Sequence, residues 1–188
     1  MVGVEDSQYG FAGSNCQSYG VYGTSVGGDI NYTIDGYWYT KTRGQNFLAA
    51  STDIAGDINV NWKDGSFGSG YADYYSNVRY GGFVRDVTVN AVNVNIAEDA
   101  NISSGTLSAA IGGTVKTIRC IVPDSDTIRI DTLQVTHEDY KAEITESAYV
   151  ENRGNVQIYG TYTITEDIDA TKITIEENAN VTVAEGVS

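Results

Sequence analysis

Gly28-Asp29-Ile30-Asn31-Tyr32-Thr33-Ile34-Asp35-Gly36 is the stretch that indicates the fold. It returns 28 positions later as Gly56-Asp57-Ile58-Asn59-Val60-Asn61-Trp62-Lys63-Asp64-Gly65, with one residue inserted before the closing Asp-Gly. In both copies apolar residues alternate with Asn or Thr at a period of two, which is the pattern of a β-strand with one apolar face. The Asp-Gly pair supplies a residue that tolerates positive φ, so we predict a turn at the end of each strand.

A second pair of related stretches lies in the other half of the chain. Ile96-Ala97-Glu98-Asp99-Ala100-Asn101-Ile102-Ser103 returns 79 positions later as Ile175-Glu176-Glu177-Asn178-Ala179-Asn180-Val181-Thr182. In each copy an acidic turn with Ala and Asn joins two short strands. Such a unit suits a solenoid, in which each coil places its turn above the one below. With about 28 residues per coil, the chain would hold roughly seven coils.

The composition favours strands and turns throughout. A single Pro, 21 Gly and 14 Tyr stand beside abundant Val, Ile and Thr, whereas residues that favour helices are scarce. With 41% hydrophobic residues, the 188-residue chain can form a core despite a formal net charge of −14. We therefore predict an all-β fold.

The acidic excess argues against two classes of partner. Nucleic acid and anionic membrane surfaces both attract clustered Lys and Arg, yet 25 Asp and Glu outweigh 11 Lys and Arg here. No run of apolar residues approaches the roughly 20 that a transmembrane helix needs. Residues 1–6 also lack the basic start of a signal peptide. We expect no nucleic-acid partner and no insertion into a membrane.

The two halves of the chain differ in character. Residues 1–82 hold most of the Gly and Tyr, whereas residues 83–188 are more acidic and richer in Val, Ile and Thr. We place a soft boundary near Gly82 and expect the Gly/Tyr-rich β repeats of the first part to continue into β-solenoid coils in the second. The alternative is that the first part has a distinct β structure, such as a sandwich.

The repeated stretches resemble those of a known class of bacterial proteins. The Gly-Asp-Ile-Asn strand with its Asp-Gly pair, together with Val21-Tyr22-Gly23 and Arg79-Tyr80-Gly81-Gly82, resembles the repeats of autotransporter passengers and adhesins. The later Ile-x-Glu-x-Ala-Asn-Val-Thr-Val stretch looks like coils of the same right-handed parallel β-helix class. Residues 105–155 lie outside the resemblance. It implies a right-handed parallel β-helix, export to the cell surface or secretion, and a role as stalk, spacer or adhesin, without catalytic residues.

The last residues, Asn180 to Ser188, fall within a recognisable repeat and carry no polar cap. Solenoids need caps because their end coils otherwise expose apolar strand faces and free edges. We therefore expect this chain to be a piece of a longer protein, and free coil ends leave self-association open.

Clustered aromatic residues are the candidate ligand-binding site. Exposed Tyr and Trp rings beside Asn and Asp would stack on sugar rings and form hydrogen bonds to their hydroxyl groups, so we expect host or bacterial surface glycans or proteins as partners. The alternative is that the rings form ladders packed between coils. The predicted ligand-binding residues are Tyr37, Trp38, Tyr39, Tyr74 and Tyr75.

Two carboxylate clusters suggest calcium as the one candidate metal, with no other cofactor expected. Asp124 and Asp126, with Asp131 nearby, could begin an oxygen shell, and Glu166-Asp167-Ile168-Asp169 is a second cluster. Neither matches the spacing of an EF-hand or of a calcium β-roll. The alternative is a solvated acidic turn.

Catalytic chemistry has little support. His137 is the only histidine, which removes most His-based metal sites and favours a surface role. Cys16 and Cys120 are the only cysteines, and either one disulfide or two free thiols fits their spacing. We therefore expect a non-enzymatic adhesin segment or stalk. The alternatives are a phage tail-fibre or spike segment, and a polysaccharide-acting β-helix enzyme.

Overall fold

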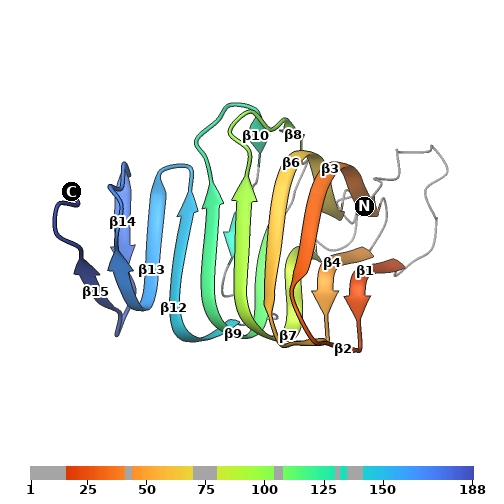
Figure 1. Ribbon diagram of the computed structural model, residues 1–188. Helices are drawn as coiled ribbons and strands as arrows, with labels where there is room; N and C mark the ends of the chain where they lie inside the picture. Colours follow the sequence, from red (N-terminus) through yellow and green to blue (C-terminus); the bar gives the residue numbers. More distant parts are fainter. Residues whose placement is uncertain (1–15, 41–43, 70–79, 104–107, 130–131, 135–141) are drawn as a thin grey trace.

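The computed structural model describes residues 16–40, 44–69, 80–103, 108–129, 132–134 and 142–188, and every regular element in these ranges is a strand. The predicted all-β class is therefore confirmed. Figure 1 shows the strands side by side in an open sheet, with β1 to β3 near one end and β15 at the other. The strands are β1 (Cys16–Tyr22), β2 (Ser25–Val26), β3 (Ile30–Thr40), β4 (Gly44–Ala50), β5 (Asp53–Ile54), β6 (Asp57–Ser69), β7 (Tyr80–Ile96), β8 (Ile102–Ser103), β9 (Ser108–Val122), β10 (Ile128–Arg129), β11 (Thr132–Gln134), β12 (Ala142–Asn152), β13 (Asn155–Ile164), β14 (Lys172–Ile175) and β15 (Asn180–Val183).

The strands that carry the two Gly-Asp-Ile-Asn stretches, β3 and β6, lie side by side and run parallel. Ile30 pairs with Ile58, so the two stretches stack with the 28-residue offset seen in the sequence. Strands β7, β9 and β12 continue the same parallel ladder, which we call the main ladder. From Ile58 the successive partners along it are Val92, Ile118 and Ala148. The chain therefore returns to the main ladder after 28, 34, 26 and 30 residues rather than at a fixed period.

Shorter parallel ladders flank the main ladder. Strand β1 pairs with β4 and β4 with the start of β7, whereas β2 pairs with β5 and β5 with the middle of β7. Strand β8 pairs with β10, and the start of β9 pairs with β11. We call each main-ladder strand, together with the chain that leads up to it, a passage. Each passage thus contributes to more than one ladder, and most backbone hydrogen bonds join residues far apart in sequence.

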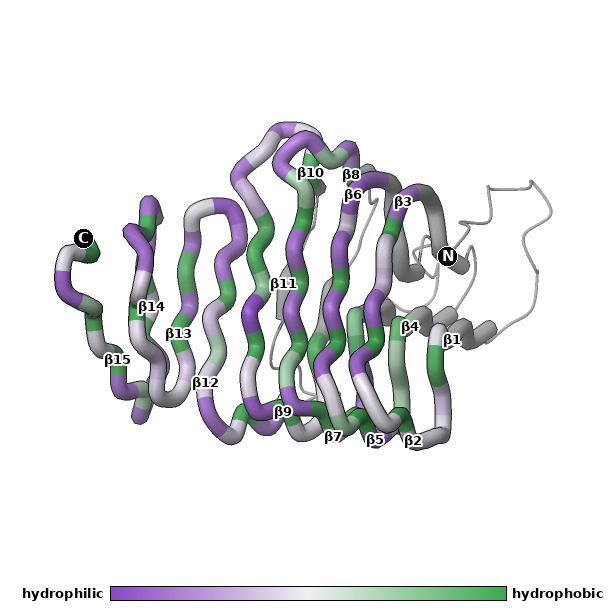
Figure 2. Tube along the Cα trace, viewed as in Figure 1, coloured by the Kyte–Doolittle hydropathy of each residue, from purple (hydrophilic) through white to green (hydrophobic). Residues whose placement is uncertain are grey.

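The main core follows from the two-residue period of the main ladder. Ile58, Val60 and Trp62 are almost completely buried, whereas Asn61 between them is exposed. Figure 2 shows this alternation of hydrophobic and hydrophilic residues along the neighbouring strands. The Trp62 ring meets the Phe83 ring edge to face, with centroids 6.1 Å apart. Phe83 belongs to the flanking ladder, so the main core lies between the two sets of strands.

The inserted Lys63 produces an irregularity in the ladder. Pairing shifts by one residue at this point, so that Asp35 pairs with Asp64 and Gly36 with Gly65. Both strands continue through their Asp-Gly pair, and the turn predicted there is wrong. The extra residue is absorbed as a β-bulge. Pairing of the two Asp-Gly stretches with each other satisfies backbone groups that a free turn would leave to solvent.

Strands β12 and β13 form an antiparallel hairpin, so the sheet is mixed. Asn152 pairs with Asn155 across the two-residue turn Arg153-Gly154. The φ angles of Arg153 and Gly154 are 52° and 74°, and positive φ at both positions is the geometry of a type I′ turn. This hairpin departs from the all-parallel stacking that the resemblance implies. It falls at the end of the region that the resemblance leaves out.

Apolar side chains of the hairpin also pack on the face of the sheet opposite the main core. Ala148 and Val150 of β12 belong to the main core, but Tyr149 between them points to the opposite face. There it joins Val156 and Ile158 of β13 in a second cluster, which we call the C-terminal core. Partly buried residues from the last part of the chain cover this cluster: Ile168, Ala170 and Val181. The sheet therefore carries a core on each face at this end.

Strand β13 bends so that its two halves pair with different strands. Its first half pairs with β14 and its second half with β15. Gly160 lies at the bend with a φ of 66°, and a Cβ atom there would overlap the carbonyl oxygen of Glu146. The bend therefore requires glycine. Three large apolar side chains on the outer edge strands remain exposed: Ile173, Ile175 and Val183.

The acidic Ala-Asn turn predicted between two short strands at residues 175–182 is confirmed, and it joins β14 to β15. The Ala179 N–H donates to the Glu176 carbonyl oxygen at 3.0 Å. The related stretch earlier in the chain makes the same turn, since the Ala100 N–H donates to the Ala97 carbonyl oxygen at 3.1 Å. The two members of the second repeated pair therefore share a local structure.

The boundary predicted near Gly82 falls inside β7, which pairs with β4 and β6 on one side and β9 on the other. Strands from both halves thus belong to one sheet. No helix that could cross a membrane occurs in the described residues.

Truncation of a main-ladder residue should destabilise the protein far more than truncation at the exposed edge. We expect Ile58→Ala to lower the free energy of unfolding by about 2–5 kcal/mol, because Ile58 is completely buried. Ile175→Ala, at a side chain that is 56% exposed, is the matched control and should cost about 1 kcal/mol or less. Urea unfolding measures both, and equal losses would contradict the assignment of the core.

The buried phenol of Tyr32 should make stability fall at high pH. Tyr32 donates to the Leu48 carbonyl oxygen at 2.6 Å, and burial raises the pKa of its phenol to about 12. Since the unfolded side chain has a pKa of about 10, the folded state holds this proton more tightly between about pH 10 and 12, and stability falls as the pH rises through that window. Tyr32→Phe should flatten the fall. An identical slope in variant and wild type would refute this contribution.

Candidate functional site

The aromatic residues predicted to bind a ligand lie in two places. The stretch Tyr37-Trp38-Tyr39 belongs to the second half of β3, where its backbone pairs with residues 66–68 of β6. Tyr74 and Tyr75 lie outside the described residues. Ligand binding by these aromatic residues stays a prediction.

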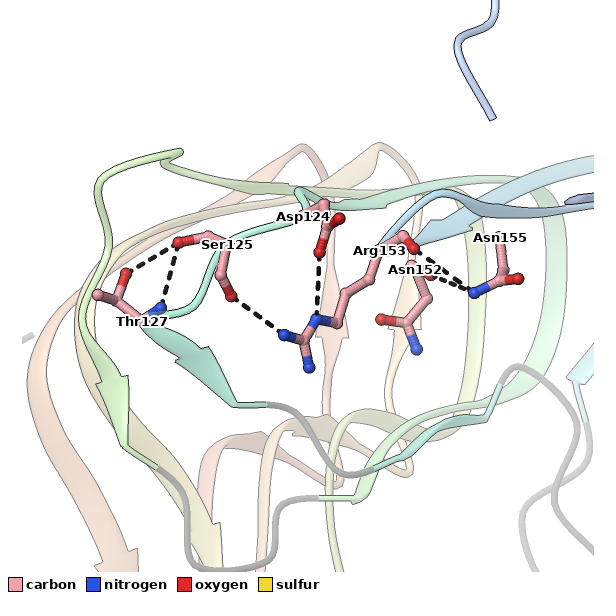
Figure 3. Close-up of polar contacts among 6 residues, drawn as sticks. All are labelled: Asp124, Ser125, Thr127, Asn152, Arg153 and Asn155. Atoms are coloured by element: carbon pink, nitrogen blue, oxygen red, sulfur yellow. Dashed lines mark hydrogen bonds and ion pairs between the residues drawn. The ribbon is translucent and has the colours of Figure 1, made fainter. Parts of the chain in front are cut away.

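Asp124 and Asp126 lie in the loop between β9 and β10, beside the β12–β13 turn. Arg153 from that turn places its Nε atom 3.6 Å from Asp124 Oδ1 and donates from Nη2 to the Ser125 carbonyl oxygen at 3.2 Å (Figure 3). No three His, Cys, Asp or Glu side chains of the described ranges gather closely enough to hold a metal ion. Calcium binding at Asp124 and Asp126 stays a prediction. It requires the guanidinium of Arg153 to move away from the Asp124 carboxylate.

The two cysteines and the histidine are placed differently. Cys120 is a free, completely buried thiol of the main core, and burial raises its pKa to about 12. The thiolate needed for nucleophilic chemistry is therefore strongly disfavoured there. The backbone of Cys16 begins β1, and His137 lies outside the described residues.

Polar side chains form two ladders on the surface of the first strands. Asn93 Nδ2 donates to Asn59 Oδ1 at 2.9 Å, and Asn59 Nδ2 donates to Asn31 Oδ1 at 3.0 Å. In the second ladder Asn90 Nδ2 donates to Asp57 Oδ1 at 2.8 Å, and the Asp57 N–H donates to an Asp29 carboxylate oxygen. The bonds join neighbouring parallel strands or, at Asp29, the residue just before β3, so the ladders reinforce the register that the core establishes.

A groove of about 260 Å³ opens on the face opposite the main core, between β9, β12, β13 and the Thr165–Asp169 loop. Arg119 pairs with Tyr149 and Ile121 with Glu151 in the main ladder, which brings these side chains to one face. The residues that line the groove are Arg119, Ile121, Tyr149, Glu151, Tyr162, Ile164, Thr165, Glu166, Asp167, Ile168 and Asp169.

Several polar groups of the groove already have a hydrogen-bond or ion-pair partner. Arg119 Nη2 lies 3.1 Å from Glu166 Oε1, and both side chains remain partly exposed. The Tyr149 hydroxyl donates to Glu151 Oε2 at 2.9 Å. Asp167 Oδ1 accepts hydrogen bonds from the N–H and the hydroxyl of Ser188, at 2.7 and 3.1 Å. With four carboxylates against one guanidinium, the groove carries a formal charge of −3.

Two tyrosine rings form the aromatic part of the groove. Tyr149 and Tyr162 stack with centroids 5.4 Å apart and planes inclined by 22°. Burial raises the pKa of the Tyr149 hydroxyl, and its hydrogen bond to Glu151 raises it further. Burial also raises the pKa of Tyr162. Both phenols are therefore protonated at neutral pH, and the groove combines aromatic surface with hydroxyl donors and carboxylate acceptors.

Only part of this groove was predicted from the sequence. The acidic cluster Glu166-Asp167-Ile168-Asp169 was a candidate site, whereas Arg119, Tyr149 and Tyr162 were not. The alternation along β9 and β12 predicts that Arg119 and Tyr149 face away from the core. Their meeting with the acidic loop could not be read from spacing, because Arg119 and Glu166 are 47 residues apart.

Comparisons with known proteins identify no relative from which a role could be transferred. No protein-family model, curated protein or solved structure matches the chain. The function must therefore be inferred from the residues and geometry of the chain itself.

Proposed function

We propose that the chain is a segment of a secreted or surface-anchored bacterial protein, folds as a right-handed parallel β-helix and acts as a stalk that presents a ligand-binding surface. The observation that carries the proposal is the parallel main ladder, in which five successive passages of the chain stack from Ile30 to Asn152. A mixed sheet at β12–β13 limits the regular part of the helix to the residues before the hairpin.

The stacking suits a load-bearing role. Each passage is held to the next by backbone hydrogen bonds and by shared burial in the main core, and the first three passages are also joined by the surface ladders through Asn59 and Asp57. In a solenoid, stability is approximately a sum over such nearest-neighbour interfaces. Length can therefore be added one coil at a time, which is what a projecting stalk requires.

The exposed edge at β14 and β15 supports the same role. Ile173, Ile175 and Val183 present apolar side chains on two strands that, within the described part of the chain, pair only with β13. Another strand–turn–strand coil stacked on this edge would cover them, as β14 and β15 cover β13. Such edges otherwise favour association with other chains.

Pulling single molecules from their two ends tests the stalk role. If coils separate one at a time, extension should increase in steps of about 9–12 nm, which is the contour length of the 26 to 34 residues between ladder positions. Ile58→Ala should lower the force of one or two steps and leave the others unchanged. Release of the whole contour length in one event at low force would contradict independent coil stacking.

A further inference from the structure

We propose that the groove between β9, β12, β13 and the Thr165–Asp169 loop binds a sugar residue that carries a protonated amino group, such as a hexosamine unit of a glycan. This inference goes beyond the stalk role and does not depend on it. It rests on the size of the groove, its stacked tyrosines and its charge.

The size of the groove suits one ring. Its volume is about 260 Å³, slightly below the roughly 300–1,000 Å³ of pockets for drug-sized ligands. The walls come from three strands and one loop, so a ligand would meet polar groups on several sides. Tyr149 and Ile121 form part of the floor, and Glu166 and Asp169 lie in the exposed loop.

The lining matches the mixed surface of a sugar. Aromatic rings contact the apolar C–H face of a sugar, while hydroxyl groups need both donors and acceptors. The partly exposed Tyr162 ring, stacked on the buried Tyr149 ring, provides the aromatic surface, and the carboxylates of Glu151 and Glu166 provide acceptors. Arg119 provides the guanidinium donor.

The charge of the groove selects among sugars. The single cation, Arg119, is already paired with Glu166, which leaves the carboxylates of Glu151, Asp167 and Asp169 in excess. An ammonium group on the ring gains charge-assisted hydrogen bonds to carboxylates. A uronic acid or a sulfated sugar meets repulsion from the same groups. The ligand is therefore an amino sugar rather than an acidic sugar.

Titration calorimetry of the full chain at about pH 6, where Asp and Glu are ionised, tests this site with three probes. They are the β-1,4-linked tetramer of glucosamine, its N-acetylated counterpart and spermine. We expect saturable binding of the glucosamine tetramer. Binding of the N-acetylated tetramer should be about 10-fold to 100-fold weaker, because it lacks the charge-assisted hydrogen bonds. Spermine has the charge without the ring and should also bind at least about 10-fold more weakly.

Variants at exposed acidic residues then locate the binding. Glu166→Gln and Asp169→Asn should each weaken binding of the glucosamine tetramer about 3-fold to 10-fold. Glu177→Gln changes an exposed carboxylate of the β14–β15 turn outside the groove and should leave binding unchanged. Circular dichroism verifies that each variant keeps the wild-type fold.

Four results would overturn the proposal. They are the absence of saturable binding by the glucosamine tetramer, equal affinity for the N-acetylated tetramer, equal affinity for spermine, and a loss in Glu177→Gln as large as in the two groove variants. The last two would mean that the acidic surface as a whole attracts polycations.

Discussion

The register of the main ladder is the constraint on which the rest of the structure depends. Ile58 must stack on Ile30 and beneath Val92, because a slip of one residue would turn every apolar side chain of a strand to solvent and every Asn to the core. The stacked amides of Asn31, Asn59 and Asn93 favour the same alignment from the outer surface. Core and surface therefore select one register together, although the chain lengths between ladder positions differ.

The hairpin at Arg153-Gly154 ends this arrangement and creates the groove. Because β13 runs antiparallel to β12, the chain cannot simply continue the parallel stack. It packs instead on the opposite face, where Tyr149 is covered by the C-terminal core. The Thr165–Asp169 loop is thereby brought over Arg119, and the Arg119–Glu166 ion pair spans the edge of the groove. The groove therefore forms because the chain after the hairpin packs on the sheet face opposite the main core.

Sequence reasoning predicted what depends on local alternation and failed where distant segments meet. The strands around Ile30 and Ile58, their offset and the extra residue at Lys63 could all be read from the pattern. The prediction of turns at the two Asp-Gly pairs was wrong because strand pairing between the two stretches outweighs the turn propensity of these residues. The Arg153-Gly154 hairpin had no clear signal, because Arg is not a residue that usually marks positive φ. Only the acidic loop of the groove could be identified from the sequence, because tertiary packing brings the residues of the other walls together.

Cross-linking between adjacent strands tests the register most directly. In a Cys16→Ser background, the account predicts that the pair Asn59→Cys and Asn93→Cys forms a disulfide under mild oxidation, because these residues are ladder partners on neighbouring strands. The pair Asn61→Cys and Asn93→Cys is displaced by two residues along the ladder, which places its Cα atoms roughly 7–8 Å apart, too far for ready bond formation. Electrophoresis without reducing agent distinguishes the two. Equal cross-linking of both pairs, or preference for the displaced pair, would contradict the parallel register and with it the proposed stalk.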